Sequence, residues 1–480
     1  PPTPESCMRN RPCSFIAVVA SAFLLPLAAR AQTDTALRFT TSVPRAATEL
    51  KAGITDMENF SLEAAAARFE SATNADPSFG LARVLYAGTT TKLTPAQRTA
   101  ELNRGVADAA RASTTELLLA AAYREFFLNR DEAAAALFRA AASLIPGDRY
   151  LAFAGVLSAT PPGTAVPSLR EFISRHPDYA PPYNNLAYAL WAQGDRAGAL
   201  EAAKRQVELN PNAPNPHDTY AELLQWNGNF AEATAAYRRA AATAPRFPEA
   251  HAGLAEVDAL QGRYDQARAH LNQAIANAYT PQQKLTYMRA IAGTYALQGA
   301  DDAVARQYEA IAREATAQQN ASLTALANAQ LAAVYGAGGK AAESHRALAA
   351  AKAASPEVPW VVHYYGVVAH GQMKHWGPAT EELNALKAKR AANLAVSPTL
   401  VAAAEGFLLT QQGRPAEALR VLSAADTTSA LIMNRIAEAH AALGHAPVAA
   451  DWNARIGRNY VLNLVDIPAA HARRRARGGR

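Results

Sequence analysis

Apolar residues recur three or four positions apart along most of this chain, which is the spacing of one face of an α-helix. Between Pro177 and Tyr279 the pattern also repeats as a block, with a period of 34 residues. Each block holds two apolar runs separated by a glycine, so it predicts two helices joined by a tight turn. Because one block cannot bury its apolar face alone, stacked copies must share a core. The pattern therefore predicts an array of helical repeats.

Three copies of the block align without a gap, and small residues stand at equivalent places in each. Alanines recur where the two helices of a copy must approach closely, and a larger side chain there would overpack the contact at about 1–3 kcal/mol. These alanines are Ala187, Ala221, Ala255, Ala199, Ala233 and Ala267. A glycine follows the first helix of each copy, where a left-handed residue ends the helix without a Cβ clash. These glycines are Gly194, Gly228 and Gly262.

This spacing of small, aromatic and proline positions resembles the tetratricopeptide repeat. The resemblance implies an all-α fold, a right-handed superhelical solenoid of stacked helix-turn-helix repeats. The segments Ala180 to Tyr188 and Asn215 to Leu223 also resemble those of bacterial, often exported, tetratricopeptide proteins of unassigned activity. No segment of the sequence has the alternation expected of strands.

The strict copies fill residues 177–281, and looser versions of the pattern extend on both sides. Residues 46–176 are predicted to form divergent helical hairpins, one of them shortened by a turn at residues 161–163. Residues 282–463 are predicted to form further repeats. Their turn glycines are Gly299, Gly339, Gly413 and Gly444. Residues 464–480 are predicted to form a basic, disordered tail. Repeats then account for most of the 480 residues, and several globular domains are not required.

Residues 1–31 have the features of a cleaved export signal. Arg9 and Arg11 precede an apolar run from Phe15 to Leu27, and residues 29–31 supply the small-x-small pattern of a cleavage site. We expect translation to start at Met8 and cleavage to follow Ala31. The apolar run is too short to cross a bilayer comfortably, since that takes about 20 residues.

Both cysteines, Cys7 and Cys13, fall inside that signal. The mature chain is then expected to form no disulfide, no thiolate metal site and no c-type haem attachment. We therefore expect an exported bacterial protein, periplasmic or secreted, with no transmembrane span after cleavage.

The formal net charge of +6 raises the question of nucleic-acid binding, but the positive charge is concentrated at the two ends of the chain. The final residues include Arg473, Arg474, Arg475, Arg477 and Arg480 with no acidic residue among them. Without the signal and the tail, the repeats are close to neutral. A charged tail alone does not form a nucleic-acid binding face, so no nucleic-acid partner is expected.

Motifs for nucleotide binding and hydrolysis are missing from the sequence, which has no G-x-x-x-x-G-K-[ST] loop, no G-x-S-x-G elbow and no H-E-x-x-H pair. The histidine cluster is His363, His370 and His375, beside Tyr364, Tyr365 and Trp376. On a continuous helix His363 and His370 would share a face about 10 Å apart along the axis, and His375 would lie off that face. A metal site would need a further ligand from elsewhere. No metal and no cofactor is therefore expected.

Two other pairs of titratable residues occur in the strict copies. Asp218 and Glu222 are four residues apart and share a helix face, as the acid pair of a hydrolase can. Without a second convergent group we interpret them as polar residues lining a groove. His217 and His251 hold the same repeat position and are interpreted as packing residues.

In tetratricopeptide proteins the first helices of successive repeats line a concave groove that receives peptides or partner helices. Carried onto this sequence, the resemblance implies a set of groove residues between the packing positions. They are Asn184, Asn185, Tyr188, Trp191, Asp218, Thr219, Glu222, Gln225, Trp226, Glu249 and Glu256. Such a groove is acidic and aromatic, which favours a neutral or basic protein or peptide. The lysine-rich clamp of some family members is not present at these positions.

The sequence thus predicts a non-catalytic exported scaffold that binds a protein or peptide, in envelope assembly or polymer export. One alternative is an enzyme, or a binder of a small molecule or metal, using the region from His363 to Trp376. Another is a structural protein that associates with itself. The fold alone does not choose among them.

Overall fold

The computed structural model describes residues 36–159, 165–355, 357–392 and 396–457. Within these ranges every regular element is an α-helix, which confirms the predicted all-α fold. None of these helices is both long enough and apolar enough to cross a membrane. The predicted export signal at residues 1–31, the turn at 161–163 and the tail at 464–480 lie outside the described residues.

The described residues form two compact units. The N-terminal unit runs to Leu223 and also contains Arg239–Phe247. The C-terminal unit contains Leu224–Arg238 and resumes at Pro248. The boundary falls within two helices, α11 (Pro214–Trp226) and α12 (Phe230–Thr243).

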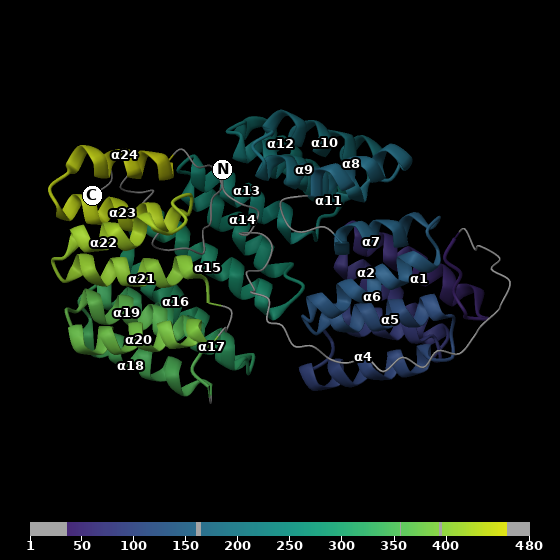
Figure 1. Ribbon diagram of the computed structural model, residues 1–480, viewed down its shortest axis with the longest axis horizontal. Helices are drawn as coiled ribbons and strands as arrows, with labels where there is room; N and C mark the ends of the chain where they lie inside the picture. Colours follow the sequence, from purple (N-terminus) through teal and green to yellow (C-terminus); the bar gives the residue numbers. More distant parts are fainter. Residues whose placement is uncertain (1–35, 160–164, 356, 393–395, 458–480) are drawn as a thin grey trace. The chain divides into compact units, whose positions relative to one another are not determined.

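Helices of the N-terminal unit pair in consecutive hairpins, each packed on the next (Figure 1). They are α1 (Pro44–Glu58), α2 (Leu62–Ala75), α3 (Gly80–Thr89), α4 (Pro95–Ala109), α5 (Thr114–Phe127), α6 (Asp131–Leu144), α7 (Arg149–Ala159), α8 (Ala165–Arg175), α9 (Pro181–Ala192) and α10 (Arg196–Leu209).

Helices of the C-terminal unit pair in the same way. They are α13 (Pro248–Leu260), α14 (Tyr264–Ala276), α15 (Pro281–Gln298), α16 (Asp301–Ala317), α17 (Ala321–Ala337), α18 (Ala341–Ala353), α19 (Trp360–Gln372), α20 (Trp376–Ala391), α21 (Pro398–Gln411), α22 (Pro415–Ser423), α23 (Ala430–Ala442) and α24 (Ala446–Gly457).

The turn inside each strict repeat requires a left-handed residue, as the sequence predicts. The φ angles of Gly194, Gly228 and Gly262 are 85°, 88° and 78°. All four glycines predicted for the later repeats are left-handed as well, with φ angles from 70° to 83°. In the hairpins α1–α2, α5–α6 and α19–α20 the left-handed residues are instead Phe60, Asn129 and Lys374. These hairpins keep the turn geometry without the glycine that marks it in the sequence.

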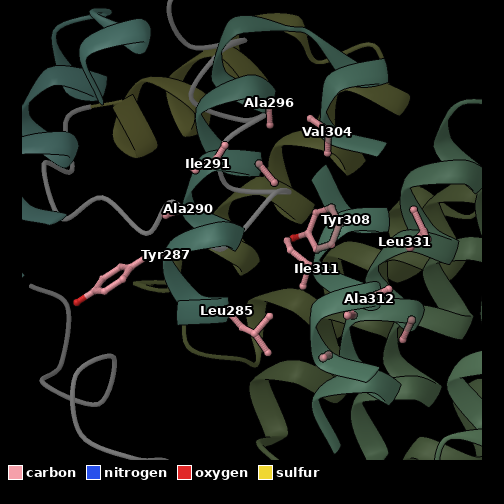
Figure 2. Close-up of a cluster of buried hydrophobic side chains, with 14 of the residues drawn as sticks. Leu285, Tyr287, Ala290, Ile291, Ala296, Val304, Tyr308, Ile311, Ala312 and Leu331 are labelled. Carbon is pink, nitrogen blue, oxygen red and sulfur yellow. The ribbon is translucent and has the colours of Figure 1, made fainter. Parts of the chain in front are cut away.

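The core is built from the small residues and from large side chains that fill the space between hairpins. The six alanines predicted at the close approaches are fully buried, which confirms their packing role. In the C-terminal unit Tyr308 of α16 is also fully buried. Figure 2 shows its ring within a cluster that includes Val304, Ile311 and Leu331. Burying a side chain of this size stabilises the fold by roughly 1.5–3 kcal/mol.

The chain enters α1 through a segment without regular secondary structure, residues 36–43, that is held by carboxylates of later hairpins. The Leu37 N–H donates to Asp148 Oδ2 at 2.7 Å, between α6 and α7. The Thr40 N–H donates to Glu116 Oε2 at 2.8 Å, in the first turn of α5. This segment therefore ties successive hairpins of the N-terminal unit together.

Candidate partner-binding surface

Polar side chains on the first helices of the strict repeats bond from one repeat to the next. In the N-terminal unit the Tyr188 hydroxyl on α9 donates to Glu222 Oε2 on α11 at 2.5 Å. One turn away, Thr219 Oγ1 donates to Asn184 Oδ1 at 2.7 Å. The partners are 34 and 35 residues apart, so they hold nearly equivalent repeat positions. We call these four residues the Tyr188–Glu222 surface.

The carboxyl group of this surface titrates near neutral pH. Burial raises the pKa of Glu222 to about 7, and the hydrogen bond from Tyr188 opposes that rise only in part. Burial also raises the pKa of Tyr188, and the neighbouring charge of Glu222 raises it further. The tyrosine therefore stays a hydrogen-bond donor, while the carboxyl group exchanges its proton around neutrality.

The C-terminal unit carries a second surface of the same kind. Gln225 Nε2 donates to Glu256 Oε2 at 2.9 Å, and the Tyr237 hydroxyl donates to Gln225 Oε1 at 3.1 Å. On the next step of the stack, Gln283 Nε2 donates to Glu249 Oε1 at 2.8 Å. We call these five residues the Glu249–Glu256 surface.

Glu249 is the least satisfied group of that surface. Its second oxygen, Oε2, is buried and has no hydrogen-bond partner among the described residues. Burial raises the pKa of this carboxyl group to about 7, against the hydrogen bonds from its own backbone N–H and from Gln283. A buried acceptor without a donor costs stability, so a donor supplied from outside would bind favourably there.

The predicted groove residues divide by their burial. Trp191, Thr219 and Gln225 are only 5%, 1% and 0% exposed, which corrects the expectation that they point into an open groove. Trp191 lies beneath the Arg196 guanidinium, whose carbon is 5.0 Å from the ring centroid, and Thr219 and Gln225 make the hydrogen bonds above. The remaining predicted residues are partly buried and keep some accessible surface. They are Asn184, Asn185, Tyr188, Asp218, Glu222, Trp226, Glu249 and Glu256.

His217 has the packing role that the sequence predicts. The residue is 8% exposed, and its Nε2 lies 2.8 Å from the carbonyl oxygen of Pro211, where α10 gives way to α11. His251 is partly buried, and its ring stacks on His270 with centroids 6.5 Å apart.

The histidines of the predicted cluster separate in the structure. His363 Nδ1 lies 2.7 Å from Glu382 Oε2, and Lys352 forms an ion pair with the same carboxylate. Burial alone would raise the pKa of Glu382, but the bonds from His363 and Lys352 hold it below its ordinary value. His363 is therefore occupied in a contact that joins α18, α19 and α20.

His370 and His375 lie together, which corrects the placement of His375 off the helix face. The continuous helix assumed from the sequence ends at Gln372, and the following turn brings His375 back beside His370. A third histidine, His345 of α18, lies beside them. The sequence reasoning missed His345 because it belongs to the preceding repeat.

A cavity of 280 Å³ in the C-terminal unit was also not predicted. Three buried polar atoms of its lining residues have no hydrogen-bond partner among the described residues: Gln330 Oε1, Gln372 Oε1 and Arg435 Nε. Tyr365 lines the cavity too, and its hydroxyl accepts a hydrogen bond from Gln330 Nε2 at 3.1 Å. The lining combines two free acceptors with one free donor.

Two protein-family models match the chain, and both describe the tetratricopeptide repeat. One matches residues 180–213 and the other residues 227–285, and together they fall almost entirely in the strict copies at 177–281. The protein is a tetratricopeptide repeat protein. Repeats of this family generally serve as scaffolds for protein interaction, and the chain is a scaffold in this general sense.

Solved structures that resemble this tetratricopeptide protein share low sequence identity with it. A thermophilic tetratricopeptide protein of Thermus thermophilus is 24% identical, with 34% of this chain and 92% of that chain covered and a TM-score of 0.32. A tetratricopeptide repeat protein of Parabacteroides merdae is 14% identical, with 57% and 99% covered and a TM-score of 0.38. PilF of Pseudomonas aeruginosa is 15% identical, with 45% and 93% covered and a TM-score of 0.33. No curated protein matches the chain.

Proposed function

We propose that this protein is a non-catalytic exported scaffold that binds an extended segment of a partner protein along its first-helix surfaces. The observation that carries the proposal is the buried, unpaired Oε2 of Glu249 beside a row of polar contacts between repeats. A peptide N–H, a lysine or an arginine would supply the missing donor. A neutral or basic segment therefore fits these surfaces best, because an acidic one would add like charge.

Isosteric substitution tests this proposal without emptying the surface. Replacing the three surface carboxylates by amides keeps their size and removes their charge. The surface variant is Glu222→Gln, Glu249→Gln and Glu256→Gln. A control with the same three glutamate-to-glutamine changes alters exposed carboxylates of the second helices α10 and α12. The control variant is Glu201→Gln, Glu208→Gln and Glu232→Gln.

The assay is crosslinking capture from the envelope of the native host, followed by titration of the captured partner's binding segment. We expect wild type and control to capture the same partner, and the surface variant to bind its segment at least about tenfold more weakly. Binding should also weaken as salt rises, since the complementary charges are near the surface. A partner bound equally by both variants would place the interface on another face of the repeats.

Export is the part of the proposal that depends on the sequence alone. The basic start, the apolar run from Phe15 to Leu27 and the cleavage pattern ending at Ala31 support it. Mass spectrometry of the protein isolated from its host tests it directly. We expect a mature chain that begins at Gln32, in the periplasm or the medium. An intact start in a cytoplasmic fraction would rule export out.

Small-molecule binding is a second candidate function, and the cavity beside Tyr365 and Gln372 favours it. A ligand with two donors and one acceptor would satisfy the free atoms of Gln330, Gln372 and Arg435. A thermal-shift screen of small polar compounds against wild type and Gln330→Met tests this candidate. Compounds that stabilise both proteins equally do not bind this cavity. Self-association is a separate prediction, which sedimentation of the purified protein measures.

A further inference from the structure

Three histidines from two successive repeats gather at one end of the C-terminal hairpins α17–α18 and α19–α20. His345 comes from α18, His370 from the last turn of α19, and His375 from the residue that precedes α20. One ring nitrogen from each lies within 4.8 Å of the others. His345 Nε2 and His375 Nδ1 are 3.3 Å apart. Two imidazole nitrogens bound to one tetrahedral ion at about 2.1 Å lie about 3.4 Å apart, so this pair already has suitable spacing.

The turn between α19 and α20 explains why two of the three histidines meet. The His375 N–H donates to the carbonyl oxygen of His370 at 2.9 Å, and Lys374 between them is left-handed with a φ of 60°. This closure brings side chains five residues apart to the same end of the hairpin. The third ligand, His345, comes from the neighbouring α18 and needs no change of the turn.

The same turn recurs between α23 and α24 and provides a natural comparison. The His445 N–H donates to the carbonyl oxygen of His440 at 2.9 Å, and the two Nδ1 atoms are 3.3 Å apart. This second pair is not part of any group of three metal-ligating residues within the described parts of the chain. The pair His440 and His445 therefore has the local geometry of His370 and His375, but no third metal-ligating side chain lies within reach among the described residues.

The burial of His370 makes this residue suitable as a metal ligand. The residue is 8% exposed, and its Nδ1 is buried without a hydrogen-bond partner in the described residues. Coordination through Nδ1 would give that atom the partner it lacks.

We propose that His345, His370 and His375 bind one divalent transition-metal ion of the zinc, cobalt or nickel class. Imidazole suits these ions, and three protein ligands leave at least one position for water or for an outside group. The ion would link α18 to the turn between α19 and α20, and so join two successive repeats. His345 is exposed and His375 is partly exposed, which gives the ion a path from solvent.

Metal binding is tested on the full chain, produced without a histidine tag and freed of metal with a chelator. Equilibrium dialysis against Zn²⁺ should give one tightly bound equivalent. Titration with Co²⁺ should give the visible absorption of a site with nitrogen ligands and low coordination number. Each of His345→Ala, His370→Ala and His375→Ala should weaken Zn²⁺ binding by about 100-fold or more, since even a change of an outer partner costs 10–100-fold. Circular dichroism checks that each variant is folded.

Two controls distinguish this site from other histidines of the chain. The double variant His440→Ala and His445→Ala removes the pair that has the same turn but no third ligand, and it should keep the tight equivalent. His363→Ala should keep it too, because His363 is bonded to Glu382 instead. Zn²⁺ should raise the melting temperature of wild type and of both controls, but not of the three single variants.

Either of two results would overturn the proposal. One is a wild-type protein that binds Zn²⁺ and Co²⁺ more weakly than about 10 μM, which would leave a hydrogen-bonded group of histidines without a metal site. The other is a tight equivalent that survives the three single variants and is lost in the double control.

Discussion

Replacing Glu222 by glutamine should stabilise the repeats around α9 and α11 in a pH-dependent way. The ordinary pKa of the group is 4.5 and its folded-state value is about 7. Because the folded state binds the proton more tightly, the stability that protonation contributes is fully present below about pH 4.5 and is lost as the pH rises through 7. One pKa unit corresponds to about 1.4 kcal/mol. The ionised carboxyl group therefore costs up to about 3 kcal/mol at about pH 8.5, and less than about 1 kcal/mol at about pH 5.

Glutamine keeps an oxygen that accepts the hydrogen bond from Tyr188, so the substitution isolates the charge. Urea unfolding at both pH values gives the free energy of unfolding, and hydrogen exchange of the α9 and α11 amides locates the gain. We expect the free energy of unfolding of Glu222→Gln to exceed that of wild type by about 1–3 kcal/mol at the higher pH and by little at the lower pH. The upper end of this range would apply to a fully buried group, and part of the Glu222 side chain reaches solvent. A gain of the same size at both pH values, or no gain at the higher one, would refute the reasoning. Tyr188→Phe should steepen the pH dependence, because it removes the bond that lowers the pKa of Glu222.

Two further predictions concern packing and the N-terminal segment. Gly253→Ala should destabilise the protein by about 1–3 kcal/mol, because a Cβ there would lie 2.1 Å from the Tyr237 ring. Gly377→Ala meets no atom within 4 Å and should be neutral or stabilising by up to about 1 kcal/mol; thermal melting compares the two, and equal effects would contradict the packing argument. Glu116→Ala should cost about 1–3 kcal/mol because the Thr40 N–H loses its acceptor. Limited proteolysis should then cut near residue 40 sooner than in wild type, and unchanged protection would show that residues 36–43 are held by other contacts.

Prediction from the sequence was most accurate in the strict copies, where the same turn geometry recurs. Gly194, Gly228 and Gly262 recur because the turn demands a left-handed residue, and the structure confirms this demand. Prediction was weaker where another residue adopts the same conformation, as Phe60 and Asn129 do in the N-terminal unit. The geometry is the same there, but the residue type that marks it in the sequence is not.

The sequence predicted the candidate site less well, because side-chain burial depends on neighbours in space. Trp191 has the repeat position and the residue type of an interface anchor, yet Arg196 lies over its ring and the residue is 5% exposed. His345 was missed for the opposite reason. Its partners are 25 and 30 residues further along the chain, and only the stacking of α18 beside α19 brings them together.

Two glutamates of the candidate surfaces, Glu222 and Glu249, have raised pKa values and are informative because a glutamine would serve the fold better. Glu222 and Glu249 accept hydrogen bonds that an amide oxygen could also accept, yet each carboxyl group lowers stability above pH 7. A role of its charge in ligand binding would explain why a residue that is unfavourable for folding is present. If the partner brings a cation to these carboxylates, their pKa values must fall on binding, and protons must leave the protein. Calorimetric titration of the partner segment at about pH 7, in buffers of different ionisation enthalpy, measures that release. We expect a net release of protons from wild type and none from the variant with all three surface carboxylates changed to glutamine; proton uptake, or an equal release from both, would mean that the charge of these glutamates is not what the partner recognises.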